Sequence, residues 1–169
     1  SLHDALPIWI GLVYGGGRLG LMGAVAAGAL AAGGEVIGVI PEALCNAEVA
    51  NHDCTELVVV KDMHERKAAF TRLSDGFVTI PGGVGTMDEL WEAVSWAQLG
   101  YHAKPVGLLN AFGFYDHLIA FLDQAMSHGL CNARVRDLLV VGTDVEDLFE
   151  RLLSQDEQPD RSPDEAVGV

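Results

Sequence analysis

The sequence predicts an α/β protein with a doubly wound, parallel sheet in a single domain. Short β-branched or apolar runs alternate with longer segments of helical period along most of the 169 residues, and this alternation is typical of a parallel sheet covered by helices. Several runs, such as Val36–Ile40, are apolar at consecutive positions, so both faces of the sheet must be covered. A length of 169 residues, half of them hydrophobic and a fifth charged, is enough for one domain with a core and hardly for two.

The expected strands are the short β-branched or apolar runs. They lie at Gly11–Tyr14, Val36–Ile40, Leu57–Val60, Phe77–Ile80, Val106–Leu109 and Leu138–Val141. The segments between and after them fit helices at Leu19–Ala32, Met63–Leu73, Thr86–Leu99, Tyr115–His128 and Asp144–Leu153. Helical connections of this kind join parallel strands.

Capping residues mark the ends of several helices. Asp62 and Thr86 can cap the starts of their helices, and each is followed three residues later by a glutamate, Glu65 or Glu89. Both starts therefore have the form of a capping box. Glycines are expected to close three of the helices, at Gly33-Gly34, Gly100 and Gly129.

The two ends of the chain differ from its middle. Ser1–Ile8 forms neither a convincing strand nor a useful helix and reads as a foreign segment, so the domain is expected to span residues 9–154. Gln155–Val169 carries two prolines, five acidic residues and one arginine without a periodic apolar face. This composition predicts a flexible acidic tail.

The charge of the chain limits its partners. A formal net charge of -14 repels nucleic-acid backbones and anionic lipid surfaces, because binding to either relies on Lys and Arg. The longest uncharged segment, Leu19–Gly34, has 16 residues, fewer than the roughly 20 apolar residues of a membrane span. We expect neither a nucleic-acid nor a membrane partner, whereas a small phosphate ligand can still be held locally by backbone amides.

The cysteines indicate a reducing compartment. Cys45, Cys54 and Cys131 are an odd number, with no C-x-x-C pair and no histidine at a zinc-site spacing. We interpret them as reduced, mostly buried thiols of a cytoplasmic protein, and expect no metal site. The chain opens without the basic and apolar regions of a secretion signal.

The most informative motif is the glycine-rich segment Pro81–Glu89, which follows one predicted strand and opens the next helix. Such a turn directs several N–H groups at one point, where the positive end of the helix dipole adds to them. A phosphate fits this arrangement. The alternative is that Gly82, Gly83 and Gly85 only form a tight turn ahead of a capping box.

A second glycine cluster, Gly15-Gly16-Gly17-Arg18-Leu19-Gly20, also follows a strand and opens a helix. Turns at the carboxyl ends of parallel strands lie on one side of a sheet, where ligands of open α/β folds bind. The cluster also matches the dinucleotide pattern G-x-G-x-x-G. The acidic residue which that pattern expects would have to be Glu42, just beyond Pro41, so NAD or FAD binding is the weaker interpretation.

A helix between the two clusters mixes cations with apolar groups on one face. Met63, Arg66, Lys67 and Phe70 are spaced i, i+3, i+4 and i+7. Arg66 and Lys67 either extend from a half-buried helix toward solvent or form a cationic wall beside a ligand pocket.

These motifs together resemble the LOG family, the cytokinin riboside 5′-monophosphate phosphoribohydrolases that were long described as lysine decarboxylases. The resemblance runs from about Gly11 to Leu153 and rests on three ordered segments. They are Tyr14–Gly17 with Gly20–Gly23, Met63–Lys67, and Pro81–Glu89, and they are joined by Trp96–Gly100 and Lys104-Pro105.

The resemblance implies a Rossmann-like fold and hydrolysis of the N-glycosidic bond of a nucleoside 5′-monophosphate, which releases a free base and ribose 5-phosphate. It implies no metal and no organic cofactor, and a homodimer. The family's catalytic arginine and glutamate fall on Arg66 and Glu89. The substrate-binding residues that it implies are Gly82, Gly83, Gly85 and Thr86 for the phosphate, with Met63, Lys67, Gly15, Gly16 and Gly17 around the nucleotide.

This chemistry agrees with the residue types. Breaking a ribosyl bond builds positive charge on the sugar, so a nearby carboxylate such as Glu89 stabilises the transition state and can orient the attacking water. Arg66, with its permanently charged planar fork, is suited to holding a substrate oxygen or the carboxylate. We expect its replacement by alanine to reduce turnover with little change in stability.

The resemblance fails at the beginning of the chain, because the family's first strand and helix have no counterpart in Ser1–Ile8. We expect part of the nucleotide pocket and of the stability to depend on that unit. The alternative function is a nucleotide-binding module without turnover, or an inactive truncated homologue. A lysine decarboxylase would need a Schiff-base lysine, and Lys61, Lys67 and Lys104 lie in no recognisable cofactor context. The sequence does not predict which base is preferred.

Overall fold

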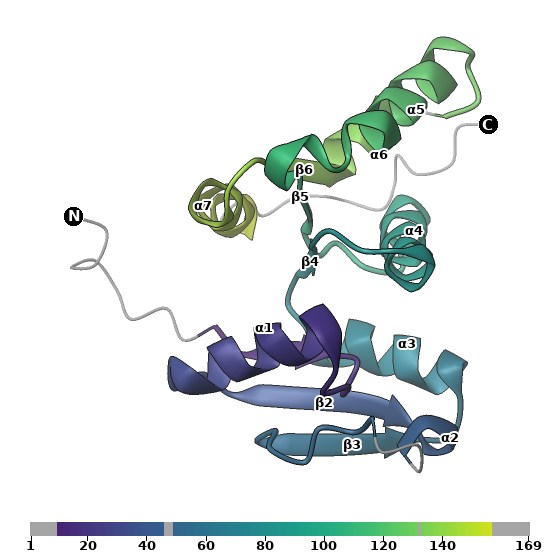
Figure 1. Cartoon of the computed structure of the whole chain (residues 1–169). Coiled ribbons are helices and arrows are strands. Elements are labelled where there is room, and N and C mark those ends of the chain that lie inside the picture. The colour runs from purple at the N-terminus through teal and green to yellow at the C-terminus, as the bar shows by residue number, and fades with distance from the viewer. Residues whose placement is uncertain (1–9, 46–48, 132, 157–169) are drawn as a thin grey trace. The chain divides into compact units, whose positions relative to one another are not determined.

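The computed structural model describes residues 10–45, 49–131 and 133–156. The chain divides into two compact units, Ser1–Ser74 and Asp75–Val169, and each is described by itself (Figure 1). The predicted foreign segment 1–8 lies outside the described residues, as does the part of the predicted acidic tail from 157 to 169. That residues 9–154 fold as one domain stays a prediction.

The first unit contains a three-stranded parallel sheet in the order β1-β2-β3. Its elements are β1 (Leu12–Tyr14), α1 (Gly20–Ala31), β2 (Val36–Pro41), α2 (Glu42–Cys45), β3 (Glu56–Val60) and α3 (Met63–Leu73). In the register, Val13 pairs with Ile37, and Gly38 pairs with Leu57. The carboxyl end of β1 therefore leads directly into the first glycine turn, beside the middle of β2.

Helices α1 and α3 cover opposite faces of this sheet. Leu12 and Tyr14 of β1 pack with Ala26 of α1, whereas Val13 belongs to the cluster that contains Ala69 of α3. Successive side chains of a strand point to opposite faces, so the two clusters lie on the two sides of the sheet. The consecutive apolar residues of the sequence predicted this double coverage, which is confirmed.

The second unit contains another three-stranded parallel sheet, in the order β4-β5-β6. Its elements are β4 (Phe77–Thr79), α4 (Val84–Gln98), β5 (Val106–Leu109), the short 3-10 helix η2 (Ala111–Gly113), α5 (Asp116–Ser127), α6 (Ala133–Leu138), β6 (Leu139–Gly142) and α7 (Val145–Asp156). Leu108 packs in the cluster that contains Leu90 of α4, and its neighbour Leu109 packs with Leu148 of α7. This sheet is also covered on both faces, as in a Rossmann-like fold.

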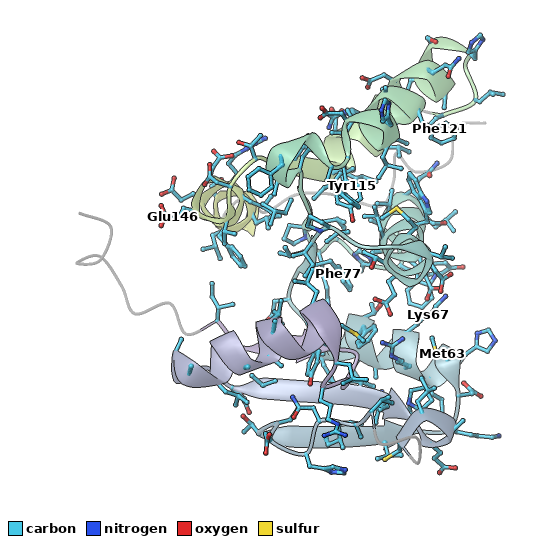
Figure 2. The ribbon with its side chains drawn as sticks, in the orientation of Figure 1. Met63, Lys67, Phe77, Tyr115, Phe121 and Glu146 are labelled. Carbon is cyan, nitrogen blue, oxygen red and sulfur yellow. The ribbon has the colours of Figure 1, made fainter. Side chains whose placement is uncertain are left out.

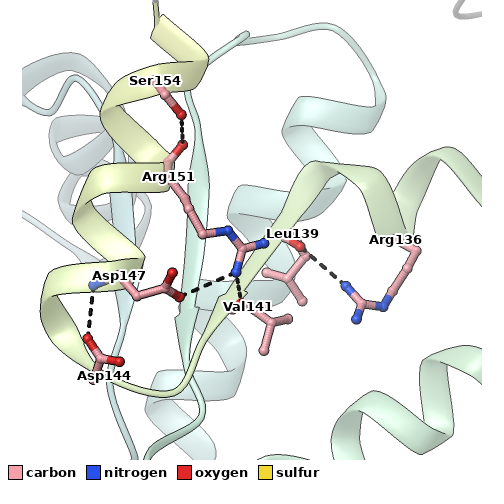
Figure 3. A network of polar contacts seen from close by, with 7 residues as sticks. All are labelled: Arg136, Leu139, Val141, Asp144, Asp147, Arg151 and Ser154. Carbon is pink, nitrogen blue, oxygen red and sulfur yellow. Dashed lines mark hydrogen bonds and ion pairs between the residues drawn. The ribbon is translucent and has the colours of Figure 1, made fainter.

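Polar contacts attach α7 to the strand before it (Figure 3). Asp144 caps the helix, because its carboxylate accepts a hydrogen bond of 2.9 Å from the Asp147 amide. Arg151 pairs with Asp147 at 3.5 Å and donates to the carbonyl of Val141 in β6. The predicted helix start at Asp144 is therefore confirmed within one residue.

The sequence placed most elements to within two residues. Helix α3 has the predicted bounds, with the Asp62 carboxylate accepting from the amides of His64 and Glu65 at 2.9 Å each. The glycines expected to end helices have φ values of 79° at Gly33, 79° at Gly100 and 70° at Gly129, in the left-handed region. The short helices α2 and α6 were not predicted.

The predicted capping box at Thr86 is wrong. Helix α4 begins two residues earlier, at Val84, and its N-cap is Gly83. Thr86 is therefore the third residue of the helix and Glu89 the sixth. A capping box needs its acidic residue at the third helical position, so Glu89 does not fill that role.

None of the helices in the described part of the chain is long and apolar enough to cross a membrane. Cys45, Cys54 and Cys131 are all free thiols and all partly buried.

Candidate functional site

The turn between β4 and α4 presents unused backbone amides to solvent. The Met87 amide bonds the Gly83 carbonyl at 3.0 Å and so makes the first bond of the helical pattern. The amides of Val84, Gly85 and Thr86 precede that bond, and no side chain caps the helix at Gly83. Gly83, Val84 and Gly85 are exposed. The first turn of α4 is therefore open to a ligand that accepts hydrogen bonds.

The two helices that follow glycine turns also differ from the others in charge. Among the described helices of eight or more residues, α3, α5 and α7 carry an acidic residue in their first turn. Helices α1 and α4 have neither an acidic first turn nor a side-chain cap. Acidic residues there would neutralise the positive end of the helix dipole. At α4 that end is left for an external anion.

Gly82 and Thr86 are in close contact across this turn. A β-carbon built on Gly82 would overlap the Thr86 hydroxyl oxygen, so a side chain at residue 82 would displace either the turn or Thr86. By contrast, a β-carbon on Gly83 or Gly85 meets nothing within 4 Å. Gly82 is required for the turn itself, and the space beside Gly83 and Gly85 is free for a ligand. We refer to Gly82–Thr86 as the amide cradle.

Glu89 lies one helical turn beyond the amide cradle. It is three residues after Thr86 and four after Gly85, and residues at these spacings are neighbours on one helix face. Its side chain is partly buried and makes contacts of its own. A carboxylate thus stands on the same helix face as the cradle, about 5 Å further along the axis by helical geometry.

The first glycine turn is closed by a neighbouring loop. The Arg18 amide donates to the Val49 carbonyl at 2.8 Å, and the Asn51 amide donates to the Gly16 carbonyl at 2.8 Å. Gly16 and Gly17 are buried, and the α-carbon of Gly16 lies 2.9 Å from a β-carbon built on Gly38 of β2. Close packing of the turn against β2 therefore explains Gly16 without a ligand. Their predicted contact with a nucleotide stays a prediction.

Arg66 is held under this turn by contacts within its own unit. Its side chain is buried, with 9% exposed. Its Nε donates to the Val39 carbonyl at 3.2 Å, and its guanidinium carbon lies 4.9 Å from the centre of the Phe70 ring. A β-carbon on Gly15 would overlap Nη2. Arg66 thus does not extend into solvent, contrary to one of the two interpretations of its helix face.

Met63 and Lys67 flank Arg66 on α3, and Figure 2 shows both side chains on that helix. The Met63 sulfur lies 3.9 Å from Nη1 of Arg66. Met63 is exposed and Lys67 is partly buried. The first unit therefore brings Gly15, Met63 and Arg66 together, as the sequence indicated. The amide cradle and Glu89 belong to the second unit.

Glu42, the residue that a dinucleotide site would require, begins the short helix α2 directly after Pro41 ends β2. It is exposed.

The sequence reasoning missed two buried polar groups behind the cradle. Tyr115 donates from its hydroxyl to the Ile80 carbonyl at 2.7 Å, and its own amide donates to Asn110 Oδ1 at 2.7 Å. Asn110 also donates to Asp116 Oδ1 at 2.8 Å. Asn110 directly follows β5, which pairs with β4. A polar residue at the carboxyl end of a strand is the signal that could have revealed this cluster.

A second missed cluster lies behind the first glycine turn. The Tyr14 hydroxyl accepts from Asn51 Nδ2 at 2.9 Å and lies 3.3 Å from the Cys54 sulfur. Burial, with the neighbouring thiol, raises the pKa of Tyr14 to about 12. The phenol therefore stays protonated and links β1 to the loop that closes the turn.

Comparisons with known proteins agree with these observations. Residues 22–152 match a protein-family model described as "Possible lysine decarboxylase". The chain is 51% identical over 143 residues to a "Probable cytokinin riboside 5'-monophosphate phosphoribohydrolase" of Oryza sativa subsp. japonica. The aligned residues make up 85% of this chain and 63% of that protein. The chain is 46% identical, again over 143 residues and 85% of its length, to a cytokinin riboside 5'-monophosphate phosphoribohydrolase of Arabidopsis thaliana, and the alignment covers 63% of that protein.

A further probable enzyme of that name from Oryza sativa subsp. japonica is 46% identical, with 68% of its length covered. The chain thus spans less than two thirds of the length of the first two relatives. The matched segment nevertheless includes most of α1, all of α3 and α4, and the amide cradle. The chain belongs to the LOG family, whose family model carries the lysine decarboxylase description and whose matching relatives are named cytokinin riboside 5'-monophosphate phosphoribohydrolases.

Proposed function

We propose that this chain hydrolyses the N-glycosidic bond of a nucleoside 5′-monophosphate, with cytokinin riboside 5′-monophosphate or AMP as substrate. Water adds to the anomeric carbon of the ribose, the bond to the base nitrogen breaks, and the base leaves with a proton. The products are the free base and ribose 5-phosphate. The names of the relatives support this reaction over decarboxylation of lysine.

The observation that carries the proposal is the amide cradle. Helix α4 starts after glycines with no side-chain cap and no acidic residue in its first turn. Backbone amides at such a terminus bind phosphate through hydrogen bonds and through the helix dipole. The net charge of -14 does not oppose this, because the amides act at hydrogen-bond range. A phosphate held at Gly82, Gly83, Gly85 and Thr86 fixes one end of the substrate.

Glu89 is the proposed catalytic carboxylate. It follows the cradle on the same helix face, and the start of α4 at Val84 removes the capping role that the sequence offered for it. The carboxylate stabilises the positive charge that develops on the ribose as the bond breaks, and it orients the attacking water. Anchoring the phosphate keeps the ribose in register during this step.

Arg66 is the second proposed catalytic residue, with Met63, Lys67 and the Gly15–Gly17 turn as further substrate contacts. The support for these roles is the LOG-family match together with the grouping of Gly15, Met63 and Arg66 in one unit. The tether to the Val39 carbonyl fixes the guanidinium in one place. A planar fork held in this way is suited to binding a substrate oxygen.

The test is incubation of the chain with AMP and, separately, with an isopentenyl-AMP. Free base is followed by chromatography and ribose 5-phosphate by a coupled assay. We expect both products in equal amounts, and the ratio of the two rates gives the base preference. The alternative, a binding module without turnover, predicts saturable nucleotide binding and no ribose 5-phosphate. If the chain neither bound the nucleotide nor released products, both functions would be contradicted.

We also propose that the chain forms a homodimer in the cytoplasm. The support is its membership of the LOG family and its free thiols at Cys45, Cys54 and Cys131, which fit a reducing compartment. Sedimentation equilibrium tests the dimer. A single species with the mass of one 18.0 kDa chain at all concentrations would contradict it.

A further inference from the structure

Tyr115 ties the start of the amide cradle to the core of its unit. Its ring is buried, with 3% exposed, and packs in the cluster that contains Leu90 of α4 and Leu122 of α5. Figure 2 shows the residue among the side chains of that unit. Its hydroxyl donates to the Ile80 carbonyl at 2.7 Å. Ile80 lies between β4 and Pro81, so the bonded carbonyl belongs to the Ile80–Pro81 peptide group at the start of the turn.

The position of the phenol is itself fixed from behind. Tyr115 is the N-cap residue of α5, and its amide donates to Asn110 Oδ1 at 2.7 Å. The Asn110 amide in turn donates to the Gly142 carbonyl at 2.8 Å, at the end of β6. The backbone that carries the phenol is therefore anchored to β5, β6 and α5, independently of the turn that the hydroxyl contacts.

The hydrogen bond fixes the direction of one peptide group. Pro81 has no N–H, so the Ile80–Pro81 peptide can offer the turn only a carbonyl. With that carbonyl directed at the phenol inside the protein, the amides after Gly82 are free to face outward. Glycine-rich turns allow peptide groups to rotate, and a carbonyl turned toward the cradle would repel a phosphate.

The electrostatics of the phenol agree with this arrangement. Burial raises the pKa of Tyr115, and the backbone amide of Gly82 acts against that rise. The hydroxyl thus stays protonated near neutral pH and remains a donor to the carbonyl. Because the Gly82 backbone acts on the same side chain, the phenol touches both sides of Pro81.

We propose that Tyr115 is a positioning residue that holds the amide cradle in its phosphate-binding conformation. The inference rests on the proposed function, because it takes the 5′-phosphate of the nucleotide as the occupant of the cradle. Tyr115 does not touch the reacting atoms in this account. It acts through the Ile80 carbonyl, and its loss weakens the hold on the phosphate.

The variant that tests this is Tyr115→Phe, which removes the hydroxyl and keeps the ring in the core. We expect the KM for AMP and the dissociation constant for ribose 5-phosphate each to rise about tenfold, the scale of one lost hydrogen bond in a binding site. We expect kcat to stay within about twofold, because the lost interaction holds ground state and transition state alike. A general disturbance of the unit would lower kcat and the melting temperature as well.

Tyr101→Phe is the matched control. Tyr101 lies in the same unit with 74% of its surface exposed, and its ring packs edge-on against Trp96 at 6.3 Å. The same atom is removed there without touching the turn. We expect unchanged KM, kcat and affinity for ribose 5-phosphate.

The native chain supplies a test that needs no variant. With tyrosine labelled at the ring carbon that bears the hydroxyl, saturation with ribose 5-phosphate is expected to shift the ¹³C resonance of Tyr115 and leave that of Tyr101 in place. This measurement decides the matter if Tyr115→Phe fails to fold.

The outcomes separate this inference from the proposed function. Turnover by the native chain with an unchanged KM in Tyr115→Phe would overturn the role of Tyr115 and leave the hydrolase intact. Ribose 5-phosphate binding that weakens in Tyr115→Phe, with no turnover by the native chain, would support Tyr115 and overturn the hydrolase. A native chain that does not bind ribose 5-phosphate would overturn both.

Discussion

The guanidinium of Arg66 lies so close to Gly15 that a β-carbon on the glycine would overlap its Nη2 atom. The two residues are 51 positions apart in the sequence, and the contact joins the first glycine turn to α3. The arginine therefore leaves no space for a side chain at position 15. Arg66 is itself positioned by the hydrogen bond from its Nε to the Val39 carbonyl. This contact gives Arg66 a structural role in addition to the proposed catalytic one.

Replacing Arg66 by alanine is expected to reduce both turnover and stability. The sequence alone predicted little change in stability, but the buried side chain contacts Phe70 and the Val39 carbonyl. Losing this packing and leaving the carbonyl without its donor should lower the free energy of unfolding by about 1–3 kcal/mol. Urea denaturation measures this. Arg72→Ala is the control, since Arg72 is exposed on the same helix, and an equal loss there would contradict the account.

Replacing Glu89 by glutamine is expected to abolish base release without unfolding the chain. The carboxylate is not part of a helix cap, and glutamine keeps its size and its helix propensity. Loss of a group that acts on the transition state lowers kcat by roughly 10²–10⁴-fold. The melting temperature should stay within error. Glu150→Gln, at an exposed site on α7, is the matched control, and normal turnover by Glu89→Gln would remove Glu89 from the mechanism.

The stability of the chain is expected to fall below about pH 6.5 through His102. The Lys104 amide donates to Nδ1 of His102 at 3.2 Å, which leaves Nε2 as the protonated atom facing the Ala93 carbonyl at 3.0 Å. Burial lowers the pKa of His102 from its usual 6.5, although the carbonyl opposes this. The folded chain therefore binds this proton less readily than the unfolded chain, so acid favours unfolding.

The measurement is the free energy of unfolding between pH 8 and pH 5 in the native chain and in His102→Gln. Stability is fully present above the pKa of the unfolded histidine and declines as the pH falls through it. His102→Gln should show a smaller decline, whereas His117→Gln, at an exposed position on α5, should keep the native slope. Equal slopes in all three proteins would argue against His102 as the source.

The residues that the sequence predicted well are those whose structure is set locally. Asp62 accepts hydrogen bonds from the amides two and three residues ahead, and the start of α3 followed from it. The run from Val36 to Ile40 is apolar throughout, and it forms the central strand of its sheet. In both cases the controlling contacts are visible within a few residues of sequence.

One error is local, whereas the others arise where a distant contact decides. Thr86 has the residue type and spacing of a helix cap, but its side chain packs against Gly82 and the helix starts earlier. The burial of Arg66 depends on a carbonyl 27 residues away, and the bond of Tyr115 reaches back 35 residues. Sequence periodicity carries no signal for such pairs. The sequence pattern located the amide cradle but gave no sign of the Tyr115 hydrogen bond to the Ile80 carbonyl.

Replacing Phe112 by asparagine is expected to stabilise the chain. Phe112 has φ 56° and ψ 23°, in the left-handed region, and its side chain is fully exposed. A non-glycine residue pays roughly 1–2 kcal/mol for this conformation, and asparagine tolerates it better. We expect a gain of about 0.5–1 kcal/mol in urea denaturation. Phe114→Asn, where φ is -54°, should bring no gain, and a loss at Phe112 would show that its ring makes an important contact.

The most direct test of the phosphate site is a titration of the ¹⁵N-labelled chain with AMP, followed by the amide resonances of individual residues. If the turn after β4 binds the phosphate, the largest shifts fall within the amide cradle, Gly82–Thr86, and they saturate together at one AMP per chain. AMP that binds while these amides stay in place would contradict the account, whichever other residues respond.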